Sequence, residues 1–528
     1  MDFAAPTVQL ADHVPPGKSL TISRACMLLS MFPEPHSWMH VSEFEMLSSG
    51  VENAKMEVEG NRTCSSSSNT NKEATLPSDP REEPLENLQG GSSCKSSSSG
   101  MKKTKIYCDY QLILDLVGKE DADAGLDPFT SRYEFVCDKS DADFLLILEH
   151  VRNFLSLPLY QRVCQFPYEG GIVRKDLLPL TVRKHCYTKG GVSPYWWLPC
   201  YDLSTEFHLF SWEYKQNELK RQAYLDADAE SRVSSSSSTS SSSSNNWIIK
   251  PAQLAQARGH KVFPQNKTCL KDMAMWCAFS DGGDKVAQKL VSKPALIRNR
   301  KIDLRVAVSV RSFAAPFEAY MSEYFYARLA NKEYKICDLT DPEMVLTVNA
   351  YGDESIANKQ ERESYEGLAS ALGLDNYVID ERSGEKMQRF KLVEEAIVRL
   401  MSHLFSGAGR SVGKWPRSSA YYCVDVILDW DYDCDNYEDG SADSGDAHDM
   451  FHTEWFRKMN IPVPRLIEVN FMGDLHGFEA AMHTLPPYDG TRGITAFHKW
   501  AAELVHCTVS TEANPKGFVR LEDFSDYF

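Results

Sequence analysis

The feature that most constrains the fold is a set of apolar, β-branched runs in the second half of the chain. Val286–Val291, Leu304–Val310 and Tyr422–Leu428 each have the length and composition of a buried strand. Ahead of the last run, Leu392–Phe405 repeats apolar residues at helical spacing, which predicts an amphipathic helix packed on the core. These segments predict a mixed α/β (α+β) fold with at least one helix against a buried sheet.

A smaller lobe is expected ahead of this region. Thr104–Cys108, Tyr133–Cys137 and Phe144–Leu148 have strand composition, and Tyr110–Val117 is typical of a helix. Alternating strands and helices predict a small N-terminal α/β lobe, which with a central lobe occupies residues 104–225.

Two low-complexity regions interrupt the chain. Residues 1–103 contain serine runs and a Pro-rich acidic stretch, so we expect them to be mostly disordered. Ser234–Ser244 is almost pure serine and cannot build a core element, which predicts a surface insertion over residues 226–246. The remaining chain then divides into a core at residues 247–512 and a tail at residues 513–528.

Charge and apolar content exclude some functions. The 528 residues carry a net charge of −17, which argues against a general nucleic-acid binder because such proteins need a basic face. No apolar stretch approaches the roughly 20 residues of a membrane helix. The 14 cysteines form no CxxC pair, and the chain starts without the pattern of a signal peptide. We therefore expect a monomeric, cytoplasmic protein that is not bound to a membrane.

Charged residues alternate with apolar ones at the start of one predicted strand. Lys301, Asp303 and Arg305 fall on one face, because Ile302 and Leu304 separate them. A buried strand that presents two cations and a carboxylate on one face indicates a binding site for an anionic ligand.

A second group consists of oxygen-bearing side chains on predicted strands. Glu468 and Asn470 are two residues apart and point to the same face, and Asp425 lies inside another apolar strand. Magnesium prefers hard oxygen ligands and takes few of them from protein. Each residue taken alone also has an ordinary explanation, since buried aspartates and strand-end lysines are often structural.

The order of the motifs is more specific than any one of them. Trp247–Pro251 is a strand that carries a lysine, Arg258-Gly259 follows in a loop, and Gln288–Val291 is a strand suited to line a base pocket. With Lys301–Arg305 and Ile467–Asn470, this series resembles the tubulin–tyrosine ligase-like family, which has an ATP-grasp fold. Further resemblance lies in Gln165–Gly170, Trp197–Leu203 and Glu318–Tyr351, and altogether it covers residues 104–510.

The resemblance implies a role for each matching position. ATP would be held by Lys250, Arg258, Gly259, Gln288, Lys289, Leu290, Val291, Lys301, Asp303 and Thr347. Within this set, Lys250 would contact the phosphates, the strand of Lys289 the adenine, and Asp303 and Thr347 the ribose. Arg305 and Arg328 would face the reacting phosphoryl group, and Asp425, Glu468 and Asn470 would bind Mg²⁺.

Three functions remain open at this point. The family joins an amino acid to a protein carboxylate through an acyl-phosphate, with tubulin as the expected acceptor. The alternative is a pseudo-ligase that binds ATP or tubulin without turnover, which is favoured by Lys261 where relatives have a second loop glycine. An ATP-grasp enzyme of small-molecule metabolism is a third reading. An acidic tubulin tail would need a basic groove, for which the candidates are Arg174, Lys175, Arg183, Lys184, Arg298, Arg300 and Lys301.

Overall fold

The computed structural model describes most of the chain from residue 103 onward. The described ranges are 103–119, 126–188, 193–231, 245–254, 257–265, 267–336, 338–348, 360–432, 453–482, 496–511 and 514–524. The low-complexity region predicted at residues 1–103 falls almost entirely outside them, as does the serine run Ser234–Ser244.

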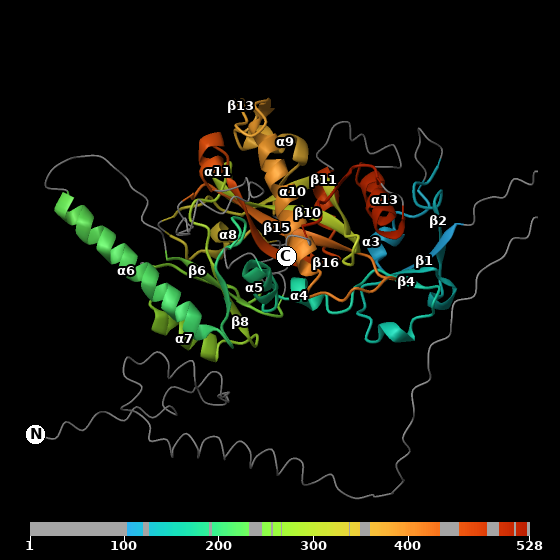
Figure 1. The fold of residues 1–528 in the computed structure, drawn as a ribbon, viewed down its shortest axis with the longest axis horizontal. Helices are drawn as coiled ribbons and strands as arrows, with labels where there is room; N and C mark the ends of the chain where they lie inside the picture. Colours follow the sequence, from blue (N-terminus) through green and yellow to red (C-terminus); the bar gives the residue numbers. More distant parts are fainter. Residues whose placement is uncertain are drawn as a thin grey trace, which may run out of the picture. The chain divides into compact units, whose positions relative to one another are not determined.

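The largest sheet runs through the middle of the described chain (Figure 1). Its strands follow the order β12-β11-β10-β15-β16 and all pair antiparallel, while β9 adds to β10 and β17 adds to β11. The bounds are β9 (Leu296–Ile297), β10 (Arg300–Ser312), β11 (Glu318–Leu329), β12 (Arg362–Glu363), β15 (Ala420–Asp429), β16 (Val463–Phe471) and β17 (Phe518–Arg520).

A second antiparallel sheet has the order β5-β8-β6-β7. Its strands are β5 (Cys200–Asp202), β6 (Trp247–Pro251), β7 (Lys261–Phe263) and β8 (Lys285–Lys289). Helices α6 (Phe207–Ser231) and α7 (Leu270–Phe279) pack against it, and the aromatic ring of Phe210 meets that of Trp247 edge to face at 4.9 Å. Aromatic contacts of this kind anchor α6 by its first three turns.

The N-terminal lobe is a parallel sheet of order β2-β1-β3-β4. It comprises β1 (Thr104–Cys108), α3 (Gln111–Leu114), β2 (Tyr133–Val136), β3 (Phe144–Leu146) and β4 (Arg162–Val163). Helix α13 (Ala496–Val509) lies beside it, since the Tyr133 hydroxyl and His506 Nδ1 are 2.7 Å apart. The lobe leads into α4 (Gly170–Val173) and α5 (Leu178–Thr188).

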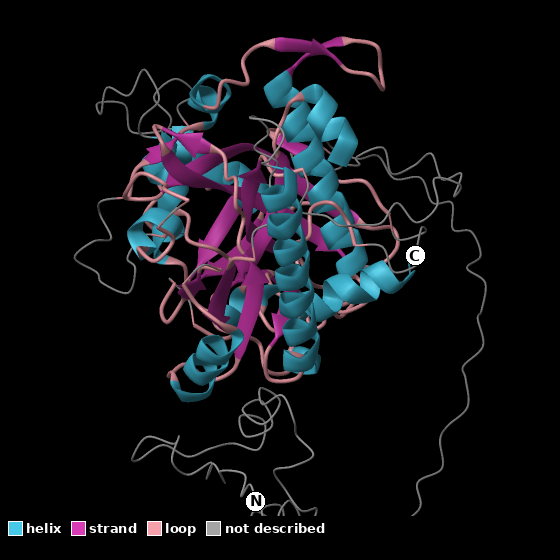
Figure 2. Ribbon diagram, turned by 90° about the vertical axis from the view of Figure 1, so that its left-hand side faces the viewer, coloured by secondary structure: helices cyan, strands magenta, loops and turns pink. Residues whose placement is uncertain are grey.

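Helices lie outside the strands, as Figure 2 shows. Helix α10 (Arg389–Ala408) packs on the large sheet with Leu392, Ile397 and Leu404 buried along one side. The hairpin of β13 (Tyr377–Ile379) and β14 (Lys386–Gln388) projects at the top of that view. The other helices are α8 (Pro342–Val345), α9 (Tyr365–Ala371), α11 (Thr453–Met459) and α12 (His476–Met482).

The mixed α/β fold predicted from the apolar runs is confirmed, with three differences in detail. The helix expected at Tyr110–Val117 is shorter, because regular α-helix covers only Gln111–Leu114. Helix α6 continues to Ser231, into the range assigned to the serine insertion, and β5 pairs with β8 across the predicted lobe boundary. A three-residue strand such as β5 needs a partner, and β8 supplies it.

Candidate functional site

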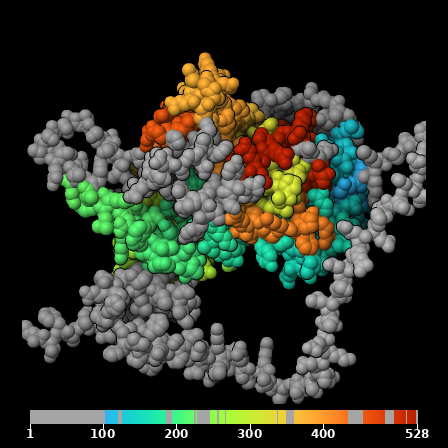
Figure 3. Space-filling model, in the orientation of Figure 1, coloured from blue at the N-terminus to red at the C-terminus, as the bar shows by residue number. Residues whose placement is uncertain are grey.

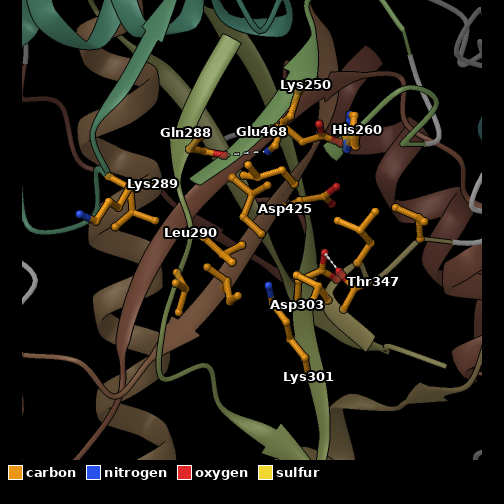
Figure 4. Close-up of a pocket in the computed structure, with 18 of the residues that line it drawn as sticks. Lys250, His260, Gln288, Lys289, Leu290, Lys301, Asp303, Thr347, Asp425 and Glu468 are labelled. Atoms are coloured by element: carbon orange, nitrogen blue, oxygen red, sulfur yellow. Dashed lines mark hydrogen bonds between the residues drawn. The ribbon is translucent and has the colours of Figure 1, made fainter. Parts of the chain in front are cut away.

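A cleft between the two antiparallel sheets gathers most of the predicted site residues (Figure 4). It contains about 620 Å³ of space, part of which is open to solvent. The predicted residues that line it are Lys250, Gln288, Lys289, Leu290, Val291, Lys301, Asp303, Arg328, Thr347, Asp425 and Glu468.

Apolar side chains from two separate clusters form two walls of this cleft. Leu198, Val291, Ile427 and Ile467 belong to one buried cluster. The other wall comes from a separate cluster, whose lining members are Ile248, Leu290, Val345 and Leu346. Apolar walls of this kind suit an aromatic ring such as a purine.

Strand register explains how the charged residues come together. Arg328 on β11 lies opposite Asp303 on β10, Arg305 on β10 lies opposite Asp425 on β15, and Asp425 lies opposite Glu468 on β16. Charges placed directly opposite each other across strands interact. Next to Glu468 the register between β15 and β16 shifts, as in a β-bulge, and such irregularities often redirect side chains beside functional sites.

Arg328 holds two carboxylates at once. Its Nε and Nη2 donate to the two carboxylate oxygens of Asp303 at 2.7 and 2.5 Å, and Nη2 is also 2.8 Å from Asp425 Oδ2. Thr347 Oγ1 donates to Asp303 Oδ2 at 2.6 Å. Thr347, which the resemblance places at the ribose, therefore belongs to the same hydrogen-bonded group.

Asp425 is almost completely buried, and both of its carboxylate oxygens accept hydrogen bonds. Arg305 contacts its two oxygens through Nε at 2.8 Å and Nη2 at 2.9 Å. Asn470 Nδ2 lies 3.4 Å from Asp425 Oδ2 and 3.3 Å from Glu468 Oε1. Arg305 and Asn470 do not themselves line the cleft but hold the carboxylates that do.

Glu468, next to Asp425, is surrounded by cations. Burial opposes its ionisation, but Lys175 and Lys250 outweigh that cost and hold the pKa of Glu468 well below its usual range. The Lys175 ammonium lies 3.4 Å from Glu468 Oε2. Lys250 donates to Gln288 Oε1 at 2.7 Å, and burial lowers the pKa of this lysine although Glu468 acts against the shift.

His260 and Lys301 are further nitrogen-bearing groups in the cleft. Burial, reinforced by Lys250, lowers the pKa of His260 to about 3, so its imidazole is neutral, and its Nε2 has no hydrogen-bond partner in the described chain. Burial also lowers the pKa of Lys301 to about 8, with Asp303 acting against the shift. In Figure 4 His260 lies near Lys250 and Glu468, whereas Lys301 lies near Asp303 and Thr347.

Some predicted residues lie elsewhere. Arg258 and Gly259 do not line the cleft, although they immediately precede His260, which does. The Lys289 ammonium lies 5.3 Å from the centre of the Trp247 ring and points away from the other labelled side chains, so Lys289 borders the cleft mainly through its backbone (Figure 4). The strand of Lys289 was predicted to line the adenine pocket, and Gln288–Val291 do border the cleft.

Sequence reasoning missed two residues, Lys175 and His260. Lys175 was named only as a candidate for a basic groove, because nothing in its local sequence ties it to a strand that lies 293 positions further on. His260 occupies a variable position of the loop motif. Lys261, the next residue, is the first residue of strand β7 and not part of the loop.

Lys261, which replaces the second loop glycine, does not adopt a strained backbone conformation. Lys261 opens β7 and is absent from the residues with positive φ, whereas Gly259 has φ +68°. The Lys261 ammonium lies over the rings of Phe263 and Trp276, at 5.2 and 5.6 Å, and not in the cleft. The backbone therefore needs a glycine at position 259 but not at 261.

The residues present fit a magnesium–nucleotide. Asp425 and Glu468 both face the Asn470 amide nitrogen, and rotation of that amide by half a turn would bring three oxygens together. No cluster of three or more His, Cys, Asp or Glu side chains suited to a metal occurs among the described residues. Two carboxylates and an amide nevertheless suffice for Mg²⁺, which keeps several waters and phosphate oxygens.

The candidate basic groove is largely neutralised. Arg174 pairs with Asp176, Arg183 with Glu206, and Arg298 and Arg300 share Glu361. These pairs leave little unpaired positive charge at Arg174, Arg183, Arg298 and Arg300.

The fold and site define a mixed α/β protein with a charged cleft between two antiparallel sheets. The chain belongs to the tubulin-tyrosine ligase family, an ATP-grasp-type family, because the family model matches residues 153–435, more than half of its length. Among curated relatives, the mouse tubulin–tyrosine ligase-like protein 12 is 22% identical over 384 residues, which is 70% of this chain and 48% of that protein. This chain thus spans about half the length of that relative.

Two other relatives carry names that state an activity. A probable tubulin polyglutamylase, ttll-9 of Caenorhabditis elegans, is 27% identical over 197 residues, covering 35% of this chain and 40% of that protein. Tubulin glycylase 3D of Tetrahymena thermophila is 22% identical over 191 residues, covering 36% and 18%.

Proposed function

We propose that this chain is an ATP-dependent ligase that joins the amine of an amino acid to a carboxylate of tubulin. The observation that carries the proposal is the polarity of the cleft, which has apolar walls and, beside them, a dense group of cations and carboxylates. The names of the polyglutamylase and glycylase relatives support tubulin as the acceptor.

The residues would divide the work according to their positions. The apolar walls would hold the adenine, with Asp303 and Thr347 at the ribose. Lys250, Arg328 and Arg305 would neutralise the phosphates and the charge that develops during phosphoryl transfer. ATP supplies the phosphoryl group that activates the acceptor carboxylate, and Asp425, Glu468 and Asn470 would hold Mg²⁺, which screens the phosphate charge.

Burial of the cleft serves the same chemistry. Asp303 and Arg328 are each less than a tenth exposed, so the charges there are poorly screened by water. Electrostatic stabilisation is stronger in such an environment than in bulk solvent.

We propose that the protein acts in the cytoplasm, where its eight described cysteines, all unbridged, would stay reduced. No helix among the described residues is both long and apolar enough to cross a bilayer.

A ligation assay tests the proposal. Purified protein is mixed with tubulin, ATP, Mg²⁺ and labelled tyrosine, glutamate or glycine, with Glu468→Gln as the control. Transfer of label by the wild type but not by the variant supports the ligase and identifies the amino acid. Equal label with both proteins, or with neither, contradicts it for those substrates.

The pseudo-ligase is the second candidate, and one observation favours it. Both oxygens of Asp425 are already taken by Arg305 and Arg328, which would have to yield before a metal could bind. Retained ATP or tubulin binding, with no label transferred in the same assay, would select this candidate.

A further inference from the structure

We propose that Lys175 is a built-in counter-ion to Glu468 that allows the cleft to bind ATP without a divalent metal ion. The inference rests on the proposed nucleotide site and adds a property of this chain's own residues. The property is the neutralisation of the ATP phosphates by side chains before a metal ion binds.

Lys175 lies in the connection between α4 and α5 and lines a smaller neighbouring pocket, which shares Lys250, Gln288 and Glu468 with the cleft. Its ammonium lies 3.4 Å from Glu468 Oε2 and donates to the backbone oxygen of Leu254 at 3.2 Å. The two side chains are mostly buried, with 15% of Lys175 and 22% of Glu468 exposed. A buried pair is screened much less by salt than a surface pair.

The surrounding segment holds Lys175 in place. Arg174 forms a double contact with Asp176, with Nε and Nη2 at 3.1 and 2.5 Å from the two oxygens, so the residues on each side of Lys175 are joined. Thr181 Oγ1 donates to the Gly171 carbonyl at 2.6 Å and ties α5 to α4. A preorganised side chain loses little entropy when it neutralises a ligand.

The charged side chains around the site carry a net positive charge. The carboxylates Asp303, Asp425 and Glu468 are matched by Lys175, Lys250, Lys301, Arg305 and Arg328, so the formal charges leave two positive charges in excess. The chain as a whole carries −17, so this excess is local. A divalent ion beside Glu468 would add positive charge next to the Lys175 ammonium, whereas a polyphosphate would supply the missing negative charge.

The test compares ATP binding with and without metal. Isothermal titration calorimetry measures the Kd of ATP for the wild type and for Lys175→Met, once with Mg²⁺ and once with EDTA. We expect the wild-type Kd to differ by less than about threefold between the two conditions. In EDTA, Lys175→Met should bind about tenfold more weakly, as expected for one lost charge-assisted contact, and Mg²⁺ should restore its affinity.

Lys458→Met is a matched control, because Lys458 also lies 3.4 Å from a carboxylate, that of Glu381, but on an exposed surface. It should bind ATP like the wild type in both conditions, and thermal melts check that each variant is folded. A wild type that binds ATP only with Mg²⁺ overturns the inference but leaves the proposed function standing, as does a Lys175→Met variant that behaves like the wild type. Failure of the wild type to bind ATP in either condition overturns both.

Discussion

At the scale of single residues, the site depends on buried charges that neutralise one another. Arg328 is the hub, because its guanidinium contacts Asp303 and Asp425 together. Its side chain is only 9% exposed, and those of the two aspartates are 4% and 1% exposed. Removing one partner from such a group leaves charges that water cannot reach.

Arg328→Met is therefore expected to lower the free energy of unfolding by roughly 3–5 kcal/mol, the cost of breaking a buried ion pair. Chemical denaturation measures the change. Arg132→Met removes an arginine from the more exposed pair with Glu503 and should cost less than about 1 kcal/mol. Equal losses for the two variants would show that the buried ion pairs of Arg328 contribute no more stability than an exposed pair.

A buried carboxyl in the N-terminal half predicts a pH dependence of stability. Burial raises the pKa of Glu169 from 4.5 to about 7, although Phe166 N–H and the Tyr422 hydroxyl donate to it. The folded state then holds this proton more tightly than the unfolded state does. The stabilisation is complete below pH 4.5 and is lost as the pH rises to about 7.

Glu169→Gln cannot ionise, so its free energy of unfolding should lack this part of the pH dependence. Relative to its value at acidic pH, the wild type should lose on the order of 3 kcal/mol more than the variant by neutral pH and above. Urea unfolding of the two proteins across this range measures the difference. Parallel pH profiles for wild type and variant would refute the assignment.

At the scale of elements, the loop between β6 and β7 decides whether the altered glycine motif matters. Gly259→Ala forces a side chain into a left-handed conformation, and the new Cβ would lie 3.0 Å from Pro251 Cγ. The strain, about 1–2 kcal/mol, should displace His260 and weaken ATP binding about tenfold. Lys261→Gly, which restores the second glycine, should change the affinity by less than about twofold. The opposite ranking in calorimetry would restore the motif's importance.

Helix α6 gives a second test at this scale, because its start packs on the β5-β8-β6-β7 sheet and β6, which follows the serine run in the sequence, belongs to that sheet. Asn245, after the run, bonds to Tyr214 and Glu218 on α6, so the chain must return along the last 13 residues of the helix, roughly 20 Å. Figure 3 shows α6 at the surface of the molecule. Trp212 and Leu219 on this helix are exposed, whereas Phe210 and Tyr214 are buried.

Deleting Ser235–Ser240 leaves enough chain to span roughly 27 Å, so the protein should keep its full helix content. Deleting Ser234–Ser243 leaves roughly 14 Å of reach, and the end of α6 should unwind. Circular dichroism of the two deletions compares the outcomes. Equal helix content would mean that the return path is shorter than the structure implies.

Sequence reasoning worked best where one element carries its own pattern. The alternation at Lys301–Arg305 placed Lys301 and Asp303 in the cleft, and the helical spacing of Leu392–Phe405 predicted α10. It failed where a contact joins distant elements, as for Lys175 with Glu468, because spacing along the chain says nothing about which loop meets which strand. It also could not tell that Lys289 turns its ammonium toward Trp247.

At the scale of the whole molecule, the cleft belongs to neither sheet alone. Lys250 and Gln288 come from the β5-β8-β6-β7 sheet, and Asp303, Arg328 and Glu468 come from the large one. A ligand there would contact both sheets and stabilise their association through binding free energy. Family membership indicates the class of chemistry, while the cleft indicates where in this chain the nucleotide would sit.

Photolabelling with an azido-adenine analogue of ATP tests that placement most directly. The account predicts that the label falls on peptides containing Leu290 and Val291 or Val345 and Leu346, which form the apolar walls, and that unlabelled ATP competes it away. Label on other peptides, or label that ATP does not displace, would contradict the assignment of this cleft as the nucleotide site.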